Sequence, residues 1–157
     1  MLAALALAAA LTGPTVDLPA LFHDQLERID PRTTVPILLP QTMPDKFGHY
    51  FPAGSASERR WHLELGGAPG CNGATACFIA DFRGRDGGRP SGSIKIDFAR
   101  GRTGRYEPIR CGASCSPPSI SWRERGSTYT IATKAGGRRT LVRMANSAIR
   151  HGPRHHD

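Results

Sequence analysis

The segment SISWRERGSTYTIAT, residues 119–133, decides the fold. In its first half, Ile120 and Trp122 alternate with polar residues. In its second half, Tyr129 and Ile131 do the same after a central Arg-Gly pair. Alternation with a period of two is typical of a half-buried strand, and a short link that contains Gly is typical of a hairpin. The segment therefore predicts two antiparallel strands that share one apolar face.

Three segments upstream of this hairpin show the same alternation and are expected to be strands. They are RRWHLELG (residues 59–66), TACFIADFRG (75–84) and GSIKIDFAR (92–100). The positions expected to face the core are Trp61, Leu63, Leu65, Phe78, Ala80, Phe82, Ile94, Ile96 and Phe98. The glycine-rich links GRDGGRPSG (84–92) and GRTGR (101–105) predict turns. Every link is too short for a parallel crossover of about a dozen residues, so the sheet should be antiparallel.

A proline-rich segment, TTVPILLPQTMP (residues 33–44), precedes these strands. Pro36, Pro40 and Pro44 lack the N–H group that a central strand needs, so an edge strand is expected here. Residues 45–59 are polar and contain Gly and Ser, which predicts a connection without regular structure.

Two helices are expected at the ends of the chain. Residues 17–29 carry an apolar stripe with a helical period, Asp17 is a suitable N-cap, and the Asp30-Pro31 pair should end this helix. The second helix follows Thr140, its expected cap, and stops before Gly152. Its apolar stripe is Leu141, Met144, Ala145, Ala148 and Ile149, and its opposite face carries Arg139, Arg143 and Arg150.

These elements predict one α+β domain over residues 13–152. We expect a single twisted antiparallel sheet of about five or six strands, with an N-terminal and a C-terminal helix packed on it. A chain of 157 residues suits one domain. Residues 1–12 are expected to be a signal-peptide segment, and residues 153–157 a flexible tail.

The expectation of export rests on the apolar run at residues 2–11. A membrane span needs about 20 residues, whereas the apolar region of a secretory signal needs about 7–15. No Lys or Arg precedes the run, so a frayed N-terminal helix is the alternative. A secreted, periplasmic or cell-envelope location without a transmembrane span is therefore expected.

The four cysteines are Cys71, Cys77, Cys111 and Cys115, and three kinds of chemistry are open to them. Redox catalysis favours Cys-x-x-Cys at a helix N-terminus, whereas CGASC is followed by two prolines and a strand. Zinc knuckles space their cysteines by about two to four residues, which CNGATAC exceeds. Disulfides suit an exported chain best. Chain entropy favours long-range bonds, while proximity favours Cys71–Cys77 and Cys111–Cys115; we expect the local pairs.

The charge of the chain is unevenly distributed. Residues 1–80 hold five Lys and Arg against seven Asp and Glu, whereas residues 81–157 hold sixteen against six. The second half, at +10, should attract polyanions. The arginines expected to bind an anion are Arg83, Arg85, Arg100, Arg102, Arg105, Arg139, Arg143 and Arg150. Arg outnumbers Lys by 18 to 3, so codon bias is a competing explanation.

The sequence predicts no catalytic residue, cofactor or metal ligand. It has no nucleophile elbow, HExxH, P-loop or GxGxxG motif. Asp81 and Asp97 are expected on neighbouring strands, and we expect both to form surface ion pairs with Arg83 and Lys95 rather than a hydrolytic pair. Nucleic-acid signatures are missing, and export argues against such a partner.

Several stretches resemble those of known bacterial protein families. VPILLPQTMP and SWRERGSTYTIATK…LVRMANSAI resemble the opening and closing units of extracytoplasmic, lipoprotein-associated domains of unknown function. CNGATAC and CGASCSPPSISW resemble parts of uncharacterised secreted proteins of actinobacteria and cyanobacteria. The resemblance covers most of residues 35–152, implies an extracytoplasmic fold, and carries over no catalytic residue. The chain lacks the anchoring cysteine that lipoproteins carry near the N-terminus.

Together these features predict a secreted, non-enzymatic cell-envelope domain that binds an anionic surface or a protein partner through its basic second half. One alternative is an envelope hydrolase whose site is assembled from distant loops. Another is a regulatory or sensor module that acts through a protein partner. The sequence leaves the oligomeric state open.

Overall fold

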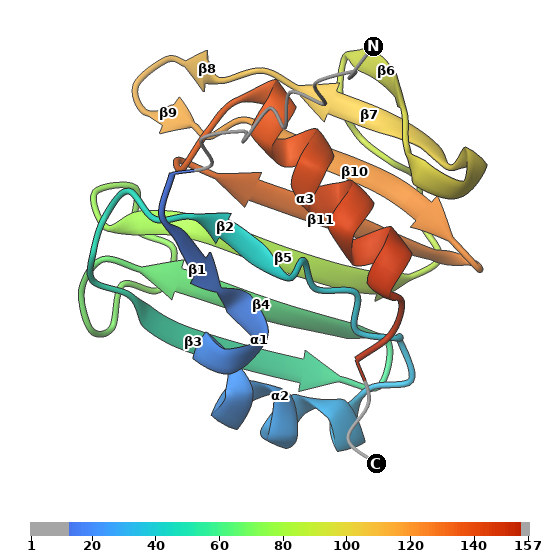
Figure 1. The fold of residues 1–157 in the computed structure, drawn as a ribbon, viewed down its shortest axis with the longest axis horizontal. Coiled ribbons are helices and arrows are strands. Elements are labelled where there is room, and N and C mark those ends of the chain that lie inside the picture. Colours follow the sequence, from blue (N-terminus) through green and yellow to red (C-terminus); the bar gives the residue numbers. More distant parts are fainter. Residues whose placement is uncertain (1–12, 155–157) are drawn as a thin grey trace, which may run out of the picture.

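A seven-stranded antiparallel sheet is the centre of the protein in the computed structural model, which describes residues 13–154 (Figure 1). Its strand order is β3-β4-β5-β11-β10-β7-β6. The strands are β3 (Phe51–Ser57), β4 (Arg60–Gly66), β5 (Phe78–Asp86), β6 (Ile94–Asp97), β7 (Thr103–Glu107), β10 (Ser119–Glu124) and β11 (Ser127–Thr133). The predicted α+β class is confirmed, and the sheet has seven strands instead of the expected five or six.

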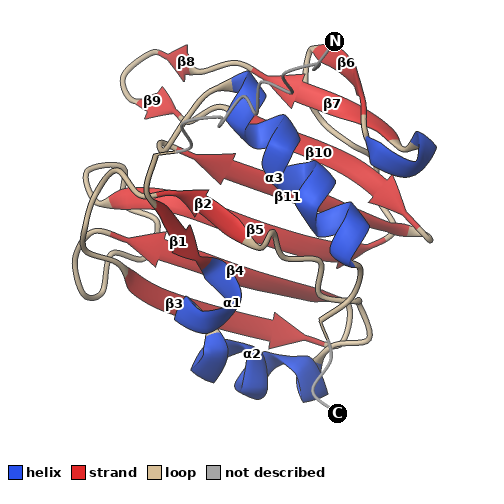
Figure 2. Ribbon diagram, viewed as in Figure 1, coloured by secondary structure: helices blue, strands red, loops and turns tan. Residues whose placement is uncertain are grey.

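Shorter elements complete the fold. Two small ribbons pair β1 (Thr15–Asp17) with β2 (Thr42–Pro44), and β8 (Arg110–Cys111) with β9 (Cys115–Ser116). The helices are α1 (Leu18–Leu21), α2 (His23–Ile29) and α3 (Arg138–His151), with 3₁₀ turns at Asp30–Arg32 and Ala99–Gly101. Figure 2 shows α1 and α3 over one face of the sheet, with α2 beside its β3 edge.

The β10–β11 hairpin has the predicted register, with Trp122 opposite Tyr129 and Ile120 opposite Ile131. All four side chains are buried. The Trp122 and Tyr129 rings stack with their centroids 5.6 Å apart, and Trp61 on β4 lies 6.3 Å from Tyr129. This aromatic row ties the hairpin to β4 across the intervening β5.

The prediction for residues 33–44 was wrong in one respect: most of this segment is not a strand. Residues 33–41, here called the crossing segment, run irregularly over the helix-bearing face, and only Thr42–Pro44 pair, with β1. Its backbone is satisfied by side chains instead of a ladder. The Nε1 of Trp61 and the hydroxyl of Tyr129 both donate to the carbonyl of Pro36, at 3.1 and 3.0 Å. Burial raises the pKa of Tyr129 to about 12.

The crossing segment supplies apolar side chains where a helix would otherwise be needed. Val35, Ile37 and Leu39 are buried, so the segment contributes to the core on the helix-bearing face of the sheet. Arg154, in the segment expected to be a flexible tail, donates from its backbone N–H to the Ile37 carbonyl and from Nε to the Leu39 carbonyl. Residues 155–157, and the expected signal segment at residues 1–12, lie outside the described part of the chain.

Two strands of the main sheet were missed because small residues occupy their core positions. On β3, which was predicted to be an irregular connection, Gly54 lies against Leu63 and Gln25; a Cβ at Gly54 would stand 3.0 Å from Leu63 Cδ2. On β7, part of which was predicted to be a turn, a Cβ at Gly104 would stand 2.6 Å from the Phe98 ring. Large partners on neighbouring elements replace the missing side chains, so neither strand shows a complete apolar alternation.

The N-terminal helix begins as predicted, with Asp17 Oδ1 accepting the Ala20 N–H at 3.0 Å. It is interrupted at Phe22, which separates α1 from α2. The Phe22 side chain is fully buried and meets Phe82 edge-on at 5.8 Å. The interruption lets α1 follow the core while α2 lies along β3, where Gln25 Nε2 donates to the Pro52 carbonyl.

The C-terminal helix α3 buries the predicted stripe of Leu141, Met144, Ala145, Ala148 and Ile149. It begins earlier than predicted, because Gly137 and not Thr140 is the N-cap. Gly152, with φ of 79°, is the C-cap. Arg139, Arg143 and Arg150 are exposed, as expected.

We predict that Leu141→Ala lowers the free energy of unfolding by about 2–5 kcal/mol, because it deletes a fully buried leucine. Arg143→Ala, on the exposed face of the same helix, should change it by less than about 0.5 kcal/mol. Urea unfolding followed by circular dichroism measures both. If Leu141→Ala left the free energy of unfolding unchanged and Arg143→Ala lowered it, the helix would have to face the sheet with its arginine side.

Candidate functional site

The face of the sheet opposite the helices carries polar side chains, and we call it the open face. Direct register partners lie on the same face, so three rows of residues can be traced across the strands. The basic row is Ser57, Arg60, Arg85, Thr128 and Arg123. The central row is Ser55, His62, Arg83, Thr130, Ser121, Arg105 and Lys95. The acidic row is Ala53, Glu64, Asp81, Ala132, Ser119 and Glu107.

The connection between β5 and β6 crosses part of this open face. The two strands run in the same direction with three strands between them, so residues 87–93 form a crossing link, whereas a turn segment was predicted at residues 84–92. Ser91 N–H donates to Ser121 Oγ at 2.8 Å, and that hydroxyl donates to the Ser91 carbonyl at 2.9 Å. Thr128 Oγ1 donates to the Gly87 carbonyl at 2.7 Å. These bonds hold the link against β10 and β11.

A depression of about 710 Å³ lies on the open face, with this link contributing to its lining. We call it the arginine depression. Its polar lining residues are Ser55, Ser57, Arg60, His62, Arg83, Arg85, Arg89, Ser91, Thr128 and Thr130. Four of these are arginines and none is a carboxylate. Hydroxyl groups from β3, β11 and the link stand among the guanidinium groups, which is a set of donors suited to an oxyanion.

Three of these arginines have no counter-ion within the described residues. The side chains of Arg60, Arg85 and Arg89 make no hydrogen bond or ion pair with any part of residues 13–154. Arg60 and Arg85 are direct register partners on β4 and β5. Like charges in that position repel each other, so the folded chain carries an electrostatic cost that an anion between them would remove.

The fourth arginine, Arg83, is bound to Asp81. Its Nε donates to Asp81 Oδ2 at 2.9 Å, and the same oxygen lies 3.2 Å from His62 Nε2. Asp81 is 5% exposed, so the prediction that it faces solvent was wrong. Asp97 is exposed on β6, and three strands separate it from Asp81 on β5, so the predicted neighbourhood of the two carboxylates was also wrong.

Asp81, His62 and Arg83 form a cluster at the boundary between the central and acidic rows. Glu64 Oε2 lies 3.9 Å from His62 Nε2, and Glu64 Oε1 accepts the Gly73 N–H at 2.6 Å. Within the described residues no hydroxyl or thiol is hydrogen-bonded to His62. The cluster thus holds a histidine between two acids, and Ser55, its register partner on β3, is not hydrogen-bonded to it.

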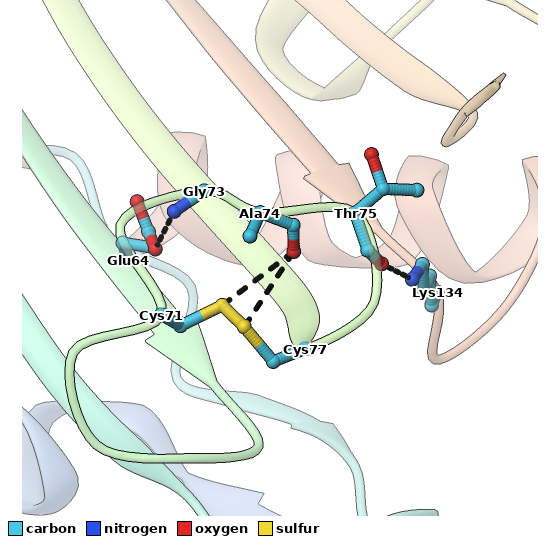
Figure 3. The surroundings of a disulfide bond; sticks show 7 residues. All are labelled: Glu64, Cys71, Gly73, Ala74, Thr75, Cys77 and Lys134. Carbon is cyan, nitrogen blue, oxygen red and sulfur yellow. Dashed lines mark hydrogen bonds between the residues drawn. A yellow bond between two sulfur atoms is a disulfide. The ribbon is translucent and has the colours of Figure 1, made fainter.

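Both disulfides join local cysteines, as predicted. Cys71 is bonded to Cys77, and Cys111 to Cys115. Figure 3 shows how the first loop is held: Glu64 of β4 accepts the Gly73 N–H, and the Lys134 ammonium donates to the Thr75 carbonyl. The disulfide therefore closes a loop that is anchored to the sheet at two further points.

A second depression of about 290 Å³ lies between these two disulfide loops. It is lined by Gly73 and Thr75 of the first loop, Cys115 and Pro117 of the second, Lys134 just after β11, and the sheet residues Phe78, Asp81, Arg83, Ser119, Thr130 and Ala132. Arg83 and Thr130 line both depressions, so the two adjoin each other, and we call them together the trough.

Phe78 belongs to the trough because of a β-bulge. Gly66 pairs with Phe78 while Leu65 pairs with Ala80, which leaves Ile79 as the extra residue. A bulge re-aims the side chains beside it. Ile79 is buried in the core, and Phe78 lines the second depression beside Asp81. The prediction that Phe78 shares the core face with Ala80 was wrong for this reason.

The structure divides the predicted anion-binding arginines between two sides of the sheet. Arg83, Arg85 and Arg105 are on the open face, whereas Arg139 and Arg143 are on the exposed side of α3, over the other face.

Two further arginines of that set have partners within the protein. Arg102 binds Glu124 at 2.6 Å, and this hydrogen bond raises the pKa of its guanidinium. Arg100 donates to the Arg150 carbonyl at 3.1 Å, which brings those two residues together. Arg60 was not predicted, although its alternation with Trp61 was a usable signal.

No family model, curated protein or solved structure matches this chain. The family resemblance described above therefore stays a prediction. Among the described residues, no helix is long and apolar enough to cross a membrane. The two disulfides are consistent with an extracytoplasmic location.

We predict opposite effects on stability for two neighbouring arginines of β5. Arg83→Gln should lower the free energy of unfolding by about 1–2 kcal/mol, since the buried Asp81 loses a charged partner that is itself partly exposed. Arg85→Gln should leave it unchanged or raise it by up to about 0.5 kcal/mol, since it relieves repulsion with Arg60. Chemical denaturation measures both changes. A larger loss of stability in Arg85→Gln than in Arg83→Gln would contradict the ion pair between Arg83 and Asp81.

Proposed function

We propose that this protein is a secreted cell-envelope binding domain that holds an anionic ligand on the open face of its sheet. The observation that carries the proposal is the arginine depression, where Arg60, Arg85 and Arg89 have no anionic partner within the described residues. The expected export and the two disulfides support the location.

The charge arrangement favours binding over a structural role for these arginines. Two exposed arginines close to the sheet are neutralised by carboxylates, Arg59 by Asp86 at 2.9 Å and Arg110 by Glu107, whereas Arg105 and Arg123 on the open face donate to backbone carbonyls. Arg60 follows Arg59 directly and has no such partner in the described chain. Unpaired guanidinium groups grouped in a concave site attract oxyanions and bind them through paired N–H donors.

A binding role also suits the chemistry of the trough better than hydrolysis. The hydrolase alternative needs a nucleophile or a water-activating base directed at a bound substrate. His62 is engaged with Asp81, and Arg83 shares the same carboxylate oxygen. This network holds Arg83, which lines both depressions, and among the described residues no hydroxyl or thiol is hydrogen-bonded to His62 as an activated nucleophile would be.

We predict that the double variant Arg60→Gln/Arg85→Gln binds dextran sulfate about tenfold more weakly than the unaltered protein at about 0.1 M salt. The matched control is Arg139→Gln/Arg143→Gln, which removes the same net charge from the exposed side of α3. This control should lose less than about threefold in affinity. Titration calorimetry at several salt concentrations measures both.

Equal losses in the two double variants would mean that binding depends only on net charge, and would contradict the proposed site. Affinity that stays constant from low to high salt would also contradict it, because exposed charge pairs are screened by salt.

A further inference from the structure

The trough has two chemically different ends, and their separation limits which anions can fill it. Arg85 and Phe78 are seven residues apart on β5, which corresponds to about 20 Å at roughly 3.3 Å per residue, less the shortening at the bulge. Arg83 and Thr130 lie between them and line both depressions. A free inorganic anion occupies one end alone, whereas an extended molecule can contact both.

The guanidinium groups without a partner are confined to one end. In the second depression Arg83 binds Asp81, while the Lys134 ammonium donates to the neutral Thr75 carbonyl and lies 6.0 Å from the centre of the Phe78 ring. Asp81 and the neighbouring Glu64 of the acidic row add negative charge there. A polymer with a phosphate on every unit would place charges against these carboxylates, so the pattern favours a ligand that is anionic at one end and neutral along the rest.

The neutral end of the trough offers an aromatic ring beside hydroxyl groups. The bulge turns Phe78 toward the second depression, where its ring is half-buried. Thr75, Ser119 and Thr130 supply hydroxyls to the same lining, and Pro117 supplies an apolar surface. The C–H face of a sugar ring stacks on an aromatic face while its hydroxyls form hydrogen bonds at the edges, so this lining fits a saccharide.

We propose that the trough binds an oligosaccharide that carries a terminal oxyanion such as a phosphate. The oxyanion sits between Arg60, Arg85 and Arg89, and the sugar chain runs past Arg83 to stack on Phe78 between the disulfide loops. This inference rests on the proposed anion-binding function and adds the class of ligand to it. Single-stranded nucleic acid fits less well, because its binding sites need positive charge along the whole backbone.

The test compares a panel of trisaccharides, with and without a terminal phosphate or sulfate, against methyl phosphate by titration calorimetry. The panel includes gluco, galacto and N-acetylhexosamine sugars. At least one phosphorylated or sulfated member should bind about tenfold or more tightly than both methyl phosphate and its uncharged counterpart.

Variants at Phe78 assign that gain to the ring. Phe78→Ala should abolish the tenfold gain and leave the affinity for methyl phosphate unchanged, whereas Phe78→Tyr, which keeps the ring, should retain it. Phe47→Ala is the matched control: this phenylalanine is 41% exposed and lies outside both depressions. It should bind the same trisaccharide as the unaltered protein does.

The outcomes separate the inference from the proposed function. If no charged trisaccharide binds more tightly than methyl phosphate while the arginine variants still weaken dextran sulfate binding, the saccharide assignment is wrong and the anion site stands. If dextran sulfate binding is also insensitive to Arg85→Gln, both are wrong. A ten-nucleotide oligothymidylate that binds more tightly than every sugar and depends on Phe78 would replace the saccharide by nucleic acid.

Discussion

The carbonyl of Pro36 is the point on which the architecture depends. It accepts hydrogen bonds from Trp61 of β4 and Tyr129 of β11, two strands that β5 separates. These bonds hold an irregular segment across the sheet with its buried backbone satisfied, as a buried polar group requires. Because that segment, α1 and α3 together cover one face, the buried apolar side chains of the sheet can be directed to that side.

The open face follows from this one-sided core. Every core residue on a strand places its neighbours on the opposite side, so the alternation that buries Trp61 and Leu63 exposes Arg60 and His62 to the trough. Two irregular features shape that face: the crossing link at residues 87–93 and the bulge that turns Phe78 outward. The disulfide loops border its other end. The arginine depression and the end of the trough at Phe78 thus both lie on the open face of the one sheet.

The sequence predicts the parts of the fold whose residues carry a regular pattern, namely the β10–β11 hairpin, strands β4, β5 and β6, and helix α3. It misses β3 and β7, because glycines at 54 and 104 replace large core side chains that come from other elements. It also misses the face of the sheet on which the Phe78 side chain lies. That face depends on a bulge between β5 and β4, which no local sequence pattern encodes. The arginines are visible in the sequence, but only the strand order shows which of them share a face with Arg60.

The central claim is that the ligand lies on the open face and not on the basic side of α3. Amide chemical-shift mapping by NMR, during titration with a short sulfated oligosaccharide, tests this most directly. The account predicts that the largest perturbations fall on residues 55–62, 83–91 and 128–130, the segments that line the arginine depression. Perturbations concentrated at residues 138–151 of α3, with those segments unchanged, would contradict it.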